Sequence, residues 1–379
     1  MLKKILVAMS GGVDSSVTAL LLKEQGYECC GCTMKLYDAG DVIRDAEETG
    51  DTAYHTDEAA KTCCSLSDID DARSVARRLG MNYHVLNYKD DFEDCVIRPF
   101  VESYERAETP NPCIECNRHL KFAKLLQQAE VLGFDGIATG HYARIEYENG
   151  RYLLKKALDP SKDQSYVLYS LTQEQLAKIL FPLGTLTKTE ARAIAERAGL
   201  VNAHKHDSQD ICFVPDGDYA GLIERYTGKT PEPGNFVTTD GKILGNHKGL
   251  IHYTIGQRKG LGIAAEAPLY VVRLDTASNS VVLGSNDDLF SKVAHVKHFH
   301  YIAGDELTSE YSGLRCSAKI RYRHTEQPCT VTYDGYSAED GHMITITFDE
   351  PQRAITPGQT AVLYDGDTVL GGGVIKGMI

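Results

Sequence analysis

The segment "MSGGVDSS", Met9 to Ser16, most constrains the fold, because it joins a short apolar run to a helix-like stretch. The run "KILVAM" before it predicts a buried strand, and residues from about Ser15 to Gln25 predict a helix that ends near Gly26. Glycines at this junction let backbone N–H groups approach a ligand, and the helix N-terminus adds a positive dipole end. This order of elements predicts a phosphate site at the edge of a parallel sheet.

The polar side chains of this segment add detail to that prediction. Ser10, Ser15 and Ser16 can donate hydroxyl hydrogen bonds, and Asp14 indicates a divalent cation such as Mg²⁺ beside the phosphate. The segment is neither a Walker A loop, which needs a lysine after its last glycine, nor a G-x-G-x-x-G fingerprint. The structural alternative is a tight turn with a serine N-cap.

The chain has two parts with different sequence patterns. Through about residue 205, strand-like and helix-like runs alternate, which predicts an α/β unit with a parallel sheet. From Asp210 onward, short β-rich runs with Gly and Pro predict one or two small β-barrels. We expect an α/β catalytic domain over residues 1–207, a central β-rich domain over 208–287 and a C-terminal β-barrel over 288–379.

The net charge of −13 argues against indiscriminate coating of nucleic acid. Two stretches, residues 241–262 and 313–324, nevertheless carry Lys and Arg without one acidic residue, while acid concentrates in residues 38–58, which we interpret as a solvated loop insertion. Such segregation permits phosphate contacts on one face, although chance clustering on solvated strands explains it equally well.

The eleven cysteines are odd in number and irregularly spaced, which favours free thiols in a reducing cytoplasm over a disulfide framework. No apolar stretch reaches the roughly 18 residues that a membrane span needs. These features predict a soluble, cytoplasmic protein that has no membrane partner.

Three cysteines lie in distinctive settings. Cys113 and Cys116, in "TPNPCIECNRHLKF", come just before an amphipathic helix, and a thiol at a helix N-terminus has a lowered pKa. The alternative interpretations of this cysteine pair are half of a zinc site and a redox dithiol. Cys212 lies in the polar segment "HDSQDICFVPDGDY", where a buried structural thiol is the alternative.

The segment "SGGVDSS" resembles the PP-loop of the N-type ATP pyrophosphatases, which split ATP into AMP and pyrophosphate. With "TGHYAR", "SKDQSYVLY", "HYTIGQRKGLGI", "IRYRH" and "ITPGQTAVLY", the whole chain resembles the tRNA-specific 2-thiouridylase family. The resemblance implies ATP-dependent adenylation of the wobble uridine O2, followed by sulfur transfer. It implies ATP binding by Ala8, Met9, Ser10, Gly11, Gly12, Val13, Asp14, Ser15, Met34 and Gly140.

The resemblance also implies the sulfur route and the RNA contacts. Cys212 would carry a persulfide supplied by a cysteine desulfurase or a sulfur-relay protein, and Cys116 would resolve it, ending as a Cys116–Cys212 disulfide. The residues expected to contact tRNA are Asn111, Pro112 and Cys113 at the target base, and His141, Lys162, Asp163, Gln164, Arg321, Tyr322, Arg323 and Gln359 elsewhere.

One position departs from the family pattern, because many members have Asp where this chain has Cys113. That Asp is expected to act as a general base, a task that a thiol cannot be assumed to perform. Three cysteines, 113, 116 and 212, could instead hold a 4Fe-4S cluster that binds the incoming sulfur, so both routes stay open. A PP-loop ligase acting on a small metabolite and a catalytically silent RNA- or metal-binding protein are the alternatives of other classes.

Overall fold

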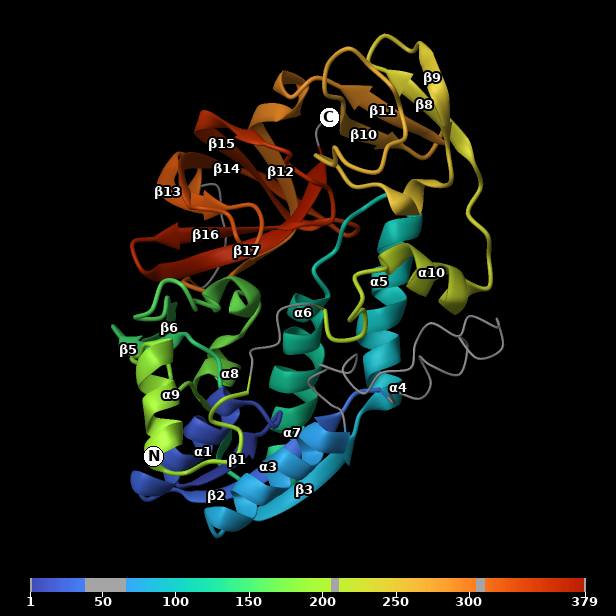
Figure 1. Ribbon diagram of the computed structural model, residues 1–379. Coiled ribbons are helices and arrows are strands. Elements are labelled where there is room, and N and C mark those ends of the chain that lie inside the picture. Colours follow the sequence, from blue (N-terminus) through green and yellow to red (C-terminus); the bar gives the residue numbers. More distant parts are fainter. Residues whose placement is uncertain (1, 38–65, 206–210, 305–310, 378–379) are drawn as a thin grey trace, which may run out of the picture. The chain divides into compact units, whose positions relative to one another are not determined.

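The computed structural model describes residues 2–37, 66–205, 211–304 and 311–377 (Figure 1). The acidic stretch 38–58 therefore lies outside the described residues. The chain forms two compact units, the first made of Met1–Ile97, Pro112–Asp218 and Asp367–Val369, the second of Arg98–Asn111, Tyr219–Gly366 and Leu370–Ile379. No helix of the described residues is long and apolar enough to cross a membrane.

A five-stranded parallel sheet forms the centre of the first unit. Its order is β3 (Asn82–Asn87), β2 (Glu28–Lys35), β1 (Lys4–Ala8), β4 (Gly136–Ala138) and β7 (Ile179–Leu180). The chain continues from β1 to β2 on one side, whereas β4 lies on the other side, so the strand order reverses at β1. Ligands bind at such a switch point, beyond the carboxyl ends of the strands. The predicted parallel sheet is thus confirmed.

Three helices pack their apolar side chains into one core with β1. They are α1 (Val13–Glu24), α3 (Leu66–Arg78) and α9 (Lys188–Arg197). The predicted end of the first helix is confirmed, since α1 ends at Glu24 and Gly26 has a φ of +86°. The sequence pattern predicts a helix from Arg192 to Gly199, and α9 begins earlier, at Lys188, because Thr187 and Glu190 form a capping box.

The remaining elements of the first unit are mostly short, and two differ from the sequence-based prediction. The run "NRHLKFAKLLQQAEVLG" predicts a helix over residues 117–133, which is partly π-helical in the structure, and "GIATGHYA" predicts a strand over residues 136–143, which ends at Ala138. Beyond the strand, Tyr142 exchanges hydrogen bonds with Gln164 at 2.9 Å and not with a strand. The remaining helices and strands of the first unit are α4 (Lys89–Phe92), η1 (Glu93–Ile97), α6 (Pro112–Glu115), η2 (Cys116–Lys124), α7 (Leu125–Val131), β5 (Arg144–Glu148), β6 (Arg151–Lys155), η3 (Ser165–Leu168) and α8 (Gln173–Leu176).

The second unit contains two β-structures, as predicted. A four-stranded sheet has the order β10 (Tyr270–Asp275), β11 (Ser280–Gly284), β8 (Gly234–Thr238) and β9 (Ile243–His247). Strands β12 to β17 form a barrel, because β12 pairs with both β15 and β17 and so closes the sheet around a buried core. The unit also contains helices α5 (Arg98–Glu105) and α10 (Tyr219–Thr227) and the short 3-10 helices η4 (Leu250–His252) and η5 (Asp287–Leu289). The barrel strands are β12 (Phe290–Tyr301), β13 (Leu314–Lys319), β14 (Gln327–Ser337), β15 (Gly341–Arg353), β16 (Thr360–Asp365) and β17 (Thr368–Gly377).

Candidate functional site

The Met9–Ser16 loop joins β1 to α1 at the switch point of the sheet. Gly12 is the N-cap of α1, with an extended backbone (φ −86°, ψ 164°) and no side-chain cap among the described residues. The first-turn N–H groups of a helix have no partner within the helix, and its dipole favours negative charge there. The loop therefore presents backbone donors where an anion is expected.

The two glycines of the loop are required for different reasons. Gly11 has a φ of +74°, and a Cβ atom there would lie 2.3 Å from the Asp68 carbonyl oxygen, so the fold itself demands glycine. Gly12 has an ordinary φ, and among the described residues the nearest atom to an added Cβ is the Ser10 Oγ at 3.5 Å. The fold tolerates a side chain at residue 12. The open space there is a cradle into which a ligand can approach the backbone.

Gly140 follows β4 and lies against the start of α1. A Cβ atom at Gly140 would lie 2.8 Å from the Ser15 nitrogen and 2.9 Å from the Asp14 carbonyl carbon. The missing side chain thus lets the segment after β4 lie against the first turn of α1. Sequence resemblance alone implied a role for Gly140, and the structure supplies a packing reason for the glycine.

Asn202 and Lys205 stabilise the backbone of the loop through its carbonyl groups. The Asn202 Nδ2 donates to the carbonyls of Gly11 (2.9 Å) and Gly12 (3.2 Å), and its side chain is buried. The Lys205 ammonium lies 2.6 Å from both Asp68 and Asp71. Burial lowers the pKa of Lys205, but its hydrogen bonds to the two carboxylates outweigh burial and raise it overall, so the ammonium stays charged. Sequence analysis missed both residues.

Asp14 is ion-paired in this structure. The Lys188 Nζ lies 2.8 Å from each carboxylate oxygen, and the Tyr142 hydroxyl donates to one of them at 2.8 Å. A carboxylate suits Mg²⁺ chemically, but Lys188 has to move aside before Asp14 can bind a cation with both oxygens. Sequence analysis did not single out Lys188 or Tyr142.

The other loop positions divide between surface and core. Ser10 is exposed, whereas the Ser16 side chain is fully buried and its hydroxyl donates to the Gly12 carbonyl at 3.0 Å. Ser15 donates to the same carbonyl and accepts the Ser10 N–H. Ala8 is half-buried, and the side chains of Met9, Val13 and Met34 belong to the core.

The cysteines lie in three environments. Cys113 is exposed on α6, Cys116 is buried at the start of η2, and Cys212 is half-buried. The Tyr37 hydroxyl donates to the Cys212 carbonyl at 2.7 Å, which ties this segment to the end of β2. Across the described ranges, no group of three His, Cys, Asp or Glu side chains is arranged as a metal site. The structure therefore does not gather the three cysteines as cluster ligands.

From the sequence, we expect the neighbouring residues Arg118 and His119 to favour the thiolate of Cys116. Arg118 and His119, which follow the cysteine in sequence, both lie against Glu115, at 3.3 Å and 3.1 Å. The Glu115 carboxylate therefore partly offsets the charge of Arg118, which supports Cys116 less than the sequence alone indicated.

The segment 139–165 carries four of the residues implied to contact tRNA. His141 is 8 % exposed and packs against Phe122 and Phe181, and burial lowers its pKa, so the ring is neutral. Asp163 accepts the N–H groups of Ala157 and Ser165. Together with the Gln164–Tyr142 bonds, these contacts fix the loop that carries Lys162, a half-buried residue.

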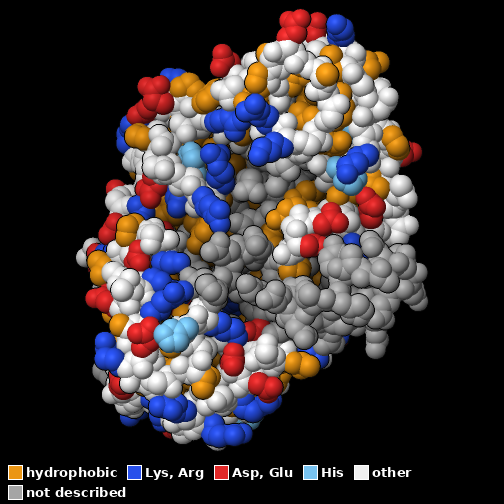
Figure 2. Space-filling view, in the orientation of Figure 1, with side chains coloured by type: hydrophobic (Ala, Val, Ile, Leu, Met, Phe, Trp, Pro, Cys, Tyr) orange, Lys and Arg blue, Asp and Glu red, His pale blue; other side chains and the backbone are white. Residues whose placement is uncertain are grey.

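The second unit carries the other implied RNA contacts. Arg321, Tyr322 and Arg323 are exposed on the turn between β13 and β14. The Gln359 Nε2 donates to the Thr109 carbonyl at 2.8 Å, two residues before Asn111, so positions far apart in sequence meet here. Figure 2 shows groups of Lys and Arg side chains on the visible face of the molecule.

Comparison with known proteins gives matches along the whole chain. Family models match residues 3–216 (tRNA methyl transferase HUP domain), 221–285 (tRNA methyl transferase PRC-barrel domain) and 291–375 (Aminomethyltransferase beta-barrel domain). The chain is 50% identical to the tRNA-specific 2-thiouridylase MnmA of Acetivibrio thermocellus, with 99% of both chains covered. It is 48% identical to the protein of that name from Clostridioides difficile, covering 99% of this chain and 98% of that one.

A solved 4-thiouridine synthetase–RNA complex with bound ATP is similar at 16% identity and a TM-score of 0.35, covering 60% of this chain and 50% of that chain. So remote a likeness carries nothing further about this chain.

Proposed function

This chain belongs to the tRNA-specific 2-thiouridylase family, and from that premise we propose that it catalyses ATP-dependent 2-thiolation of the wobble uridine of tRNA. The observation that carries the proposal is the cradle at Gly12, a glycine that the fold does not require, at the uncapped start of α1. That cradle suits the phosphates of ATP. The exposed Arg321–Tyr322–Arg323 turn suits an RNA backbone and an unstacked base.

The first step is adenylation. The uridine O2 attacks the α-phosphorus of ATP, the bond to the bridging oxygen of the β-phosphate breaks, and pyrophosphate leaves with the electron pair. The residues Ala8 to Ser15, Met34 and Gly140 bind the nucleotide, with the α1 N–H groups toward the phosphates. Mg²⁺, held with the nucleotide by Asp14 after Lys188 moves aside, would neutralise phosphate charge.

The second step transfers sulfur. A desulfurase or relay protein loads Cys212 as a persulfide, whose terminal sulfur attacks the uridine C2 and displaces AMP. The Cys116 thiolate then attacks the Cys212 sulfur, which breaks the S–S bond, releases 2-thiouridine and leaves a Cys116–Cys212 disulfide. A dithiol reductant regenerates both thiols. Cys113 replaces the family's Asp, so another group has to supply the base.

Contacts with tRNA come from both units. We assign the surroundings of the target base to Asn111, Pro112 and Cys113. Gln359 supports the segment before Asn111 through Thr109. The other contacts are assigned to His141, Lys162, Asp163, Gln164, Arg321, Tyr322 and Arg323.

The test separates activation from sulfur transfer. We expect Cys212→Ala and Cys116→Ala to abolish 2-thiouridine formation, measured by nucleoside mass spectrometry, while tRNA-dependent pyrophosphate release persists. Cys95→Ala, at a half-buried cysteine outside the proposed site, is the control and should retain thiolation. Thiolation by Cys212→Ala would refute the sulfur route. Pyrophosphate release that responds to a small amine or amino acid and not to tRNA would favour the ligase alternative.

A further inference from the structure

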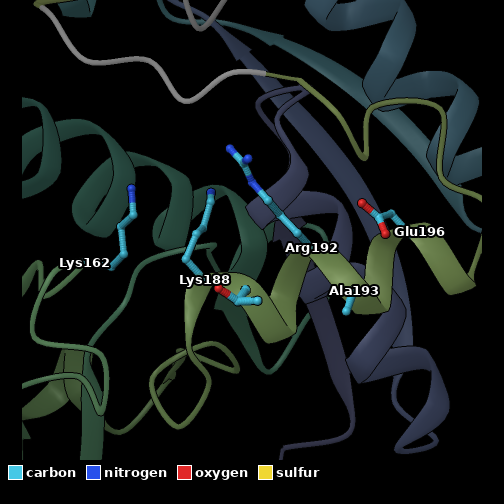
Figure 3. A pocket seen from close by; sticks show the side chains of 6 residues that line it. Lys162, Lys188, Arg192, Ala193 and Glu196 are labelled. Carbon is cyan, nitrogen blue, oxygen red and sulfur yellow. The ribbon is translucent and has the colours of Figure 1, made fainter.

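A cavity of about 450 Å³ lies along α9, where Lys188 and Arg192 extend from the helix to the same side (Figure 3). Lys188 is ion-paired with Asp14, so this cavity belongs to the surroundings of the nucleotide loop and carries no separate site. The feature that does carry one lies in the barrel of the second unit, where two cysteines face each other across neighbouring strands.

Cys316 on β13 lies directly opposite Cys329 on β14 in the antiparallel register, and both are free thiols. Side chains at opposite positions extend to the same face of a sheet, and the two Sγ atoms are 3.6 Å apart. The Cα atoms of such a pair are about 4.5–5.5 Å apart, within the range of about 4.4–6.8 Å that a disulfide spans. The backbone therefore already has the spacing that a bond between the two sulfurs requires.

The two thiols differ in their access to solvent. Cys329 is fully buried in the barrel core and lies opposite Phe348 of β15 on its other side, whereas Cys316 is half-buried. The hydrogen bond with Cys316 and burial both raise the pKa of Cys329, so its sulfur stays protonated. A reagent in solution therefore reaches Cys316 first, and Cys329 is in place to attack the product.

The cysteine pair lies at the base of the turn that carries Arg321, Tyr322 and Arg323. The two cysteines are 13 positions apart, and this exposed turn lies between them. Between the pair and the turn, Ser317 lies opposite Pro328, which has no N–H group to donate to the ladder. A disulfide would add a covalent link close to the place where the ladder lacks this donor, and it would restrict the conformations of the turn.

We propose that Cys316 and Cys329 form a reversible redox site, which a small-molecule disulfide oxidises to a cross-strand disulfide that restrains the turn. The inference goes beyond the proposed function and does not rest on it. The Cys316 thiolate attacks one sulfur of the small disulfide, forms a mixed disulfide and releases the first small thiolate, which takes up the proton that Cys316 lost. Cys329 then loses its proton, attacks the Cys316 sulfur and releases the second small thiol. Two electrons pass from the protein to the small disulfide, and a dithiol reverses both steps.

Peptide mapping of the full chain tests the site. The protein is incubated with oxidised glutathione, alkylated with N-ethylmaleimide in denaturant and digested with trypsin without reduction. Trypsin cleaves after Arg315, Lys319 and Arg323, so the bond would join peptide 316–319 to peptide 324–353. We expect this linked peptide in the wild type and its loss after treatment with dithiothreitol. Amide hydrogen exchange of the turn should slow by about threefold or more in the oxidised protein.

Cys30 is the matched control, because it is buried on β2 and lies opposite Leu6 and Asn82, neither of which is a thiol. It should be alkylated to the same extent before and after oxidation. Cys316→Ser changes the half-buried member of the pair, and it should lose both the linked peptide and the redox dependence of exchange. Thermal unfolding confirms that this variant is folded.

Three results would overturn the proposal. The first is a wild type that keeps both thiols in oxidised glutathione. The second is a stable glutathione adduct on Cys316, which would mean that Cys329 does not attack the mixed disulfide. The third is a linked peptide without slower exchange of the turn, because the bond would then not restrain it.

Discussion

Lys188 places its ammonium 2.8 Å from both carboxylate oxygens of Asp14, although 174 positions separate the two residues. The pair joins the first turn of α9 to the first turn of α1, and Tyr142 completes it with a hydroxyl hydrogen bond. The Lys188 side chain is 11% exposed and that of Asp14 30%, so the pair is partly shielded from water.

This geometry predicts that Lys188→Met destabilises the protein. The substitution leaves the Asp14 carboxylate without its cation, and we expect a loss of about 1–3 kcal/mol in the free energy of unfolding, less than for a fully buried pair. Asp14→Asn with Lys188→Met should lose less than the sum of the single variants. Urea unfolding of all four proteins in the cycle measures the coupling, and a coupling energy near zero would contradict the role of the pair.

The two loop glycines predict different behaviour on substitution. Gly12→Ala should fold, because among the described residues the added methyl contacts the Ser10 Oγ at 3.5 Å without a clash, and it should lose less than about 1 kcal/mol as a weaker N-cap, but it should fill the cradle and weaken ATP binding. Gly11→Ala should lose stability, because of its φ and its clash with the Asp68 carbonyl oxygen. Thermal unfolding and ATP titration, run on both variants, test this. An unchanged ATP affinity for Gly12→Ala would remove the cradle from the nucleotide site.

Asn202 holds the conformation of the Gly11–Gly12 loop, so replacing it should affect ATP binding through the loop. Asn202→Ala removes the Nδ2 donor from the carbonyls of Gly11 and Gly12. We expect this to lower the free energy of unfolding by about 1–3 kcal/mol and to let the loop change its conformation. We expect weaker ATP binding together with the loss of stability, since both depend on loop conformation. Asn246→Ala, at an exposed asparagine of β9, is the control. Normal ATP binding in a measurably destabilised Asn202→Ala would show that loop conformation and affinity are independent.

Iron analysis separates the two sulfur routes. Since the described residues do not group Cys113, Cys116 and Cys212 as metal ligands, we expect anaerobically purified protein to lack iron and acid-labile sulfide while remaining active with a desulfurase and a relay. About four irons per chain, lost in Cys113→Ala, would contradict this and favour a cluster.

What the sequence could predict was local. The strand, loop and helix between Lys4 and Gly26 follow one another directly, so apolar pattern and glycine placement are enough to indicate them. The four-stranded sheet and the barrel after residue 210 are likewise indicated by short β-rich runs separated by turn residues. The fold class followed from such patterns.

What the sequence could not predict depends on contacts across the chain. Asn202 bonds to Gly11 at a separation of 191 residues, and nothing in its neighbourhood marks it as a loop support. The local sequence around Lys188 predicts a surface lysine on an amphipathic helix. Only the folded structure shows that Lys188 is buried against Asp14. The same holds for Arg118 and His119. Their place in the sequence predicts an effect on Cys116, and only the folded structure shows that both lie against Glu115.

His324 predicts a pH dependence of the second unit's stability. Burial lowers the pKa of its imidazole to about 4, and the charge of Arg321 acts in the same direction. In the unfolded chain the pKa is about 6.5, so between pH 6.5 and pH 4 the unfolded state binds a proton that the folded state does not. Stability therefore falls as the pH drops through this window and is fully present above it.

The ideal slope for one such group is about 1.4 kcal/mol per pH unit, and we expect about half of that because the ring is partly exposed to solvent. His324→Asn should remove this part of the pH dependence. Urea unfolding of wild type and variant at pH 7 and pH 5 measures the difference. Equal losses in both proteins would mean that the imidazole is already accessible to protons in the folded state, and that burial does not set its pKa.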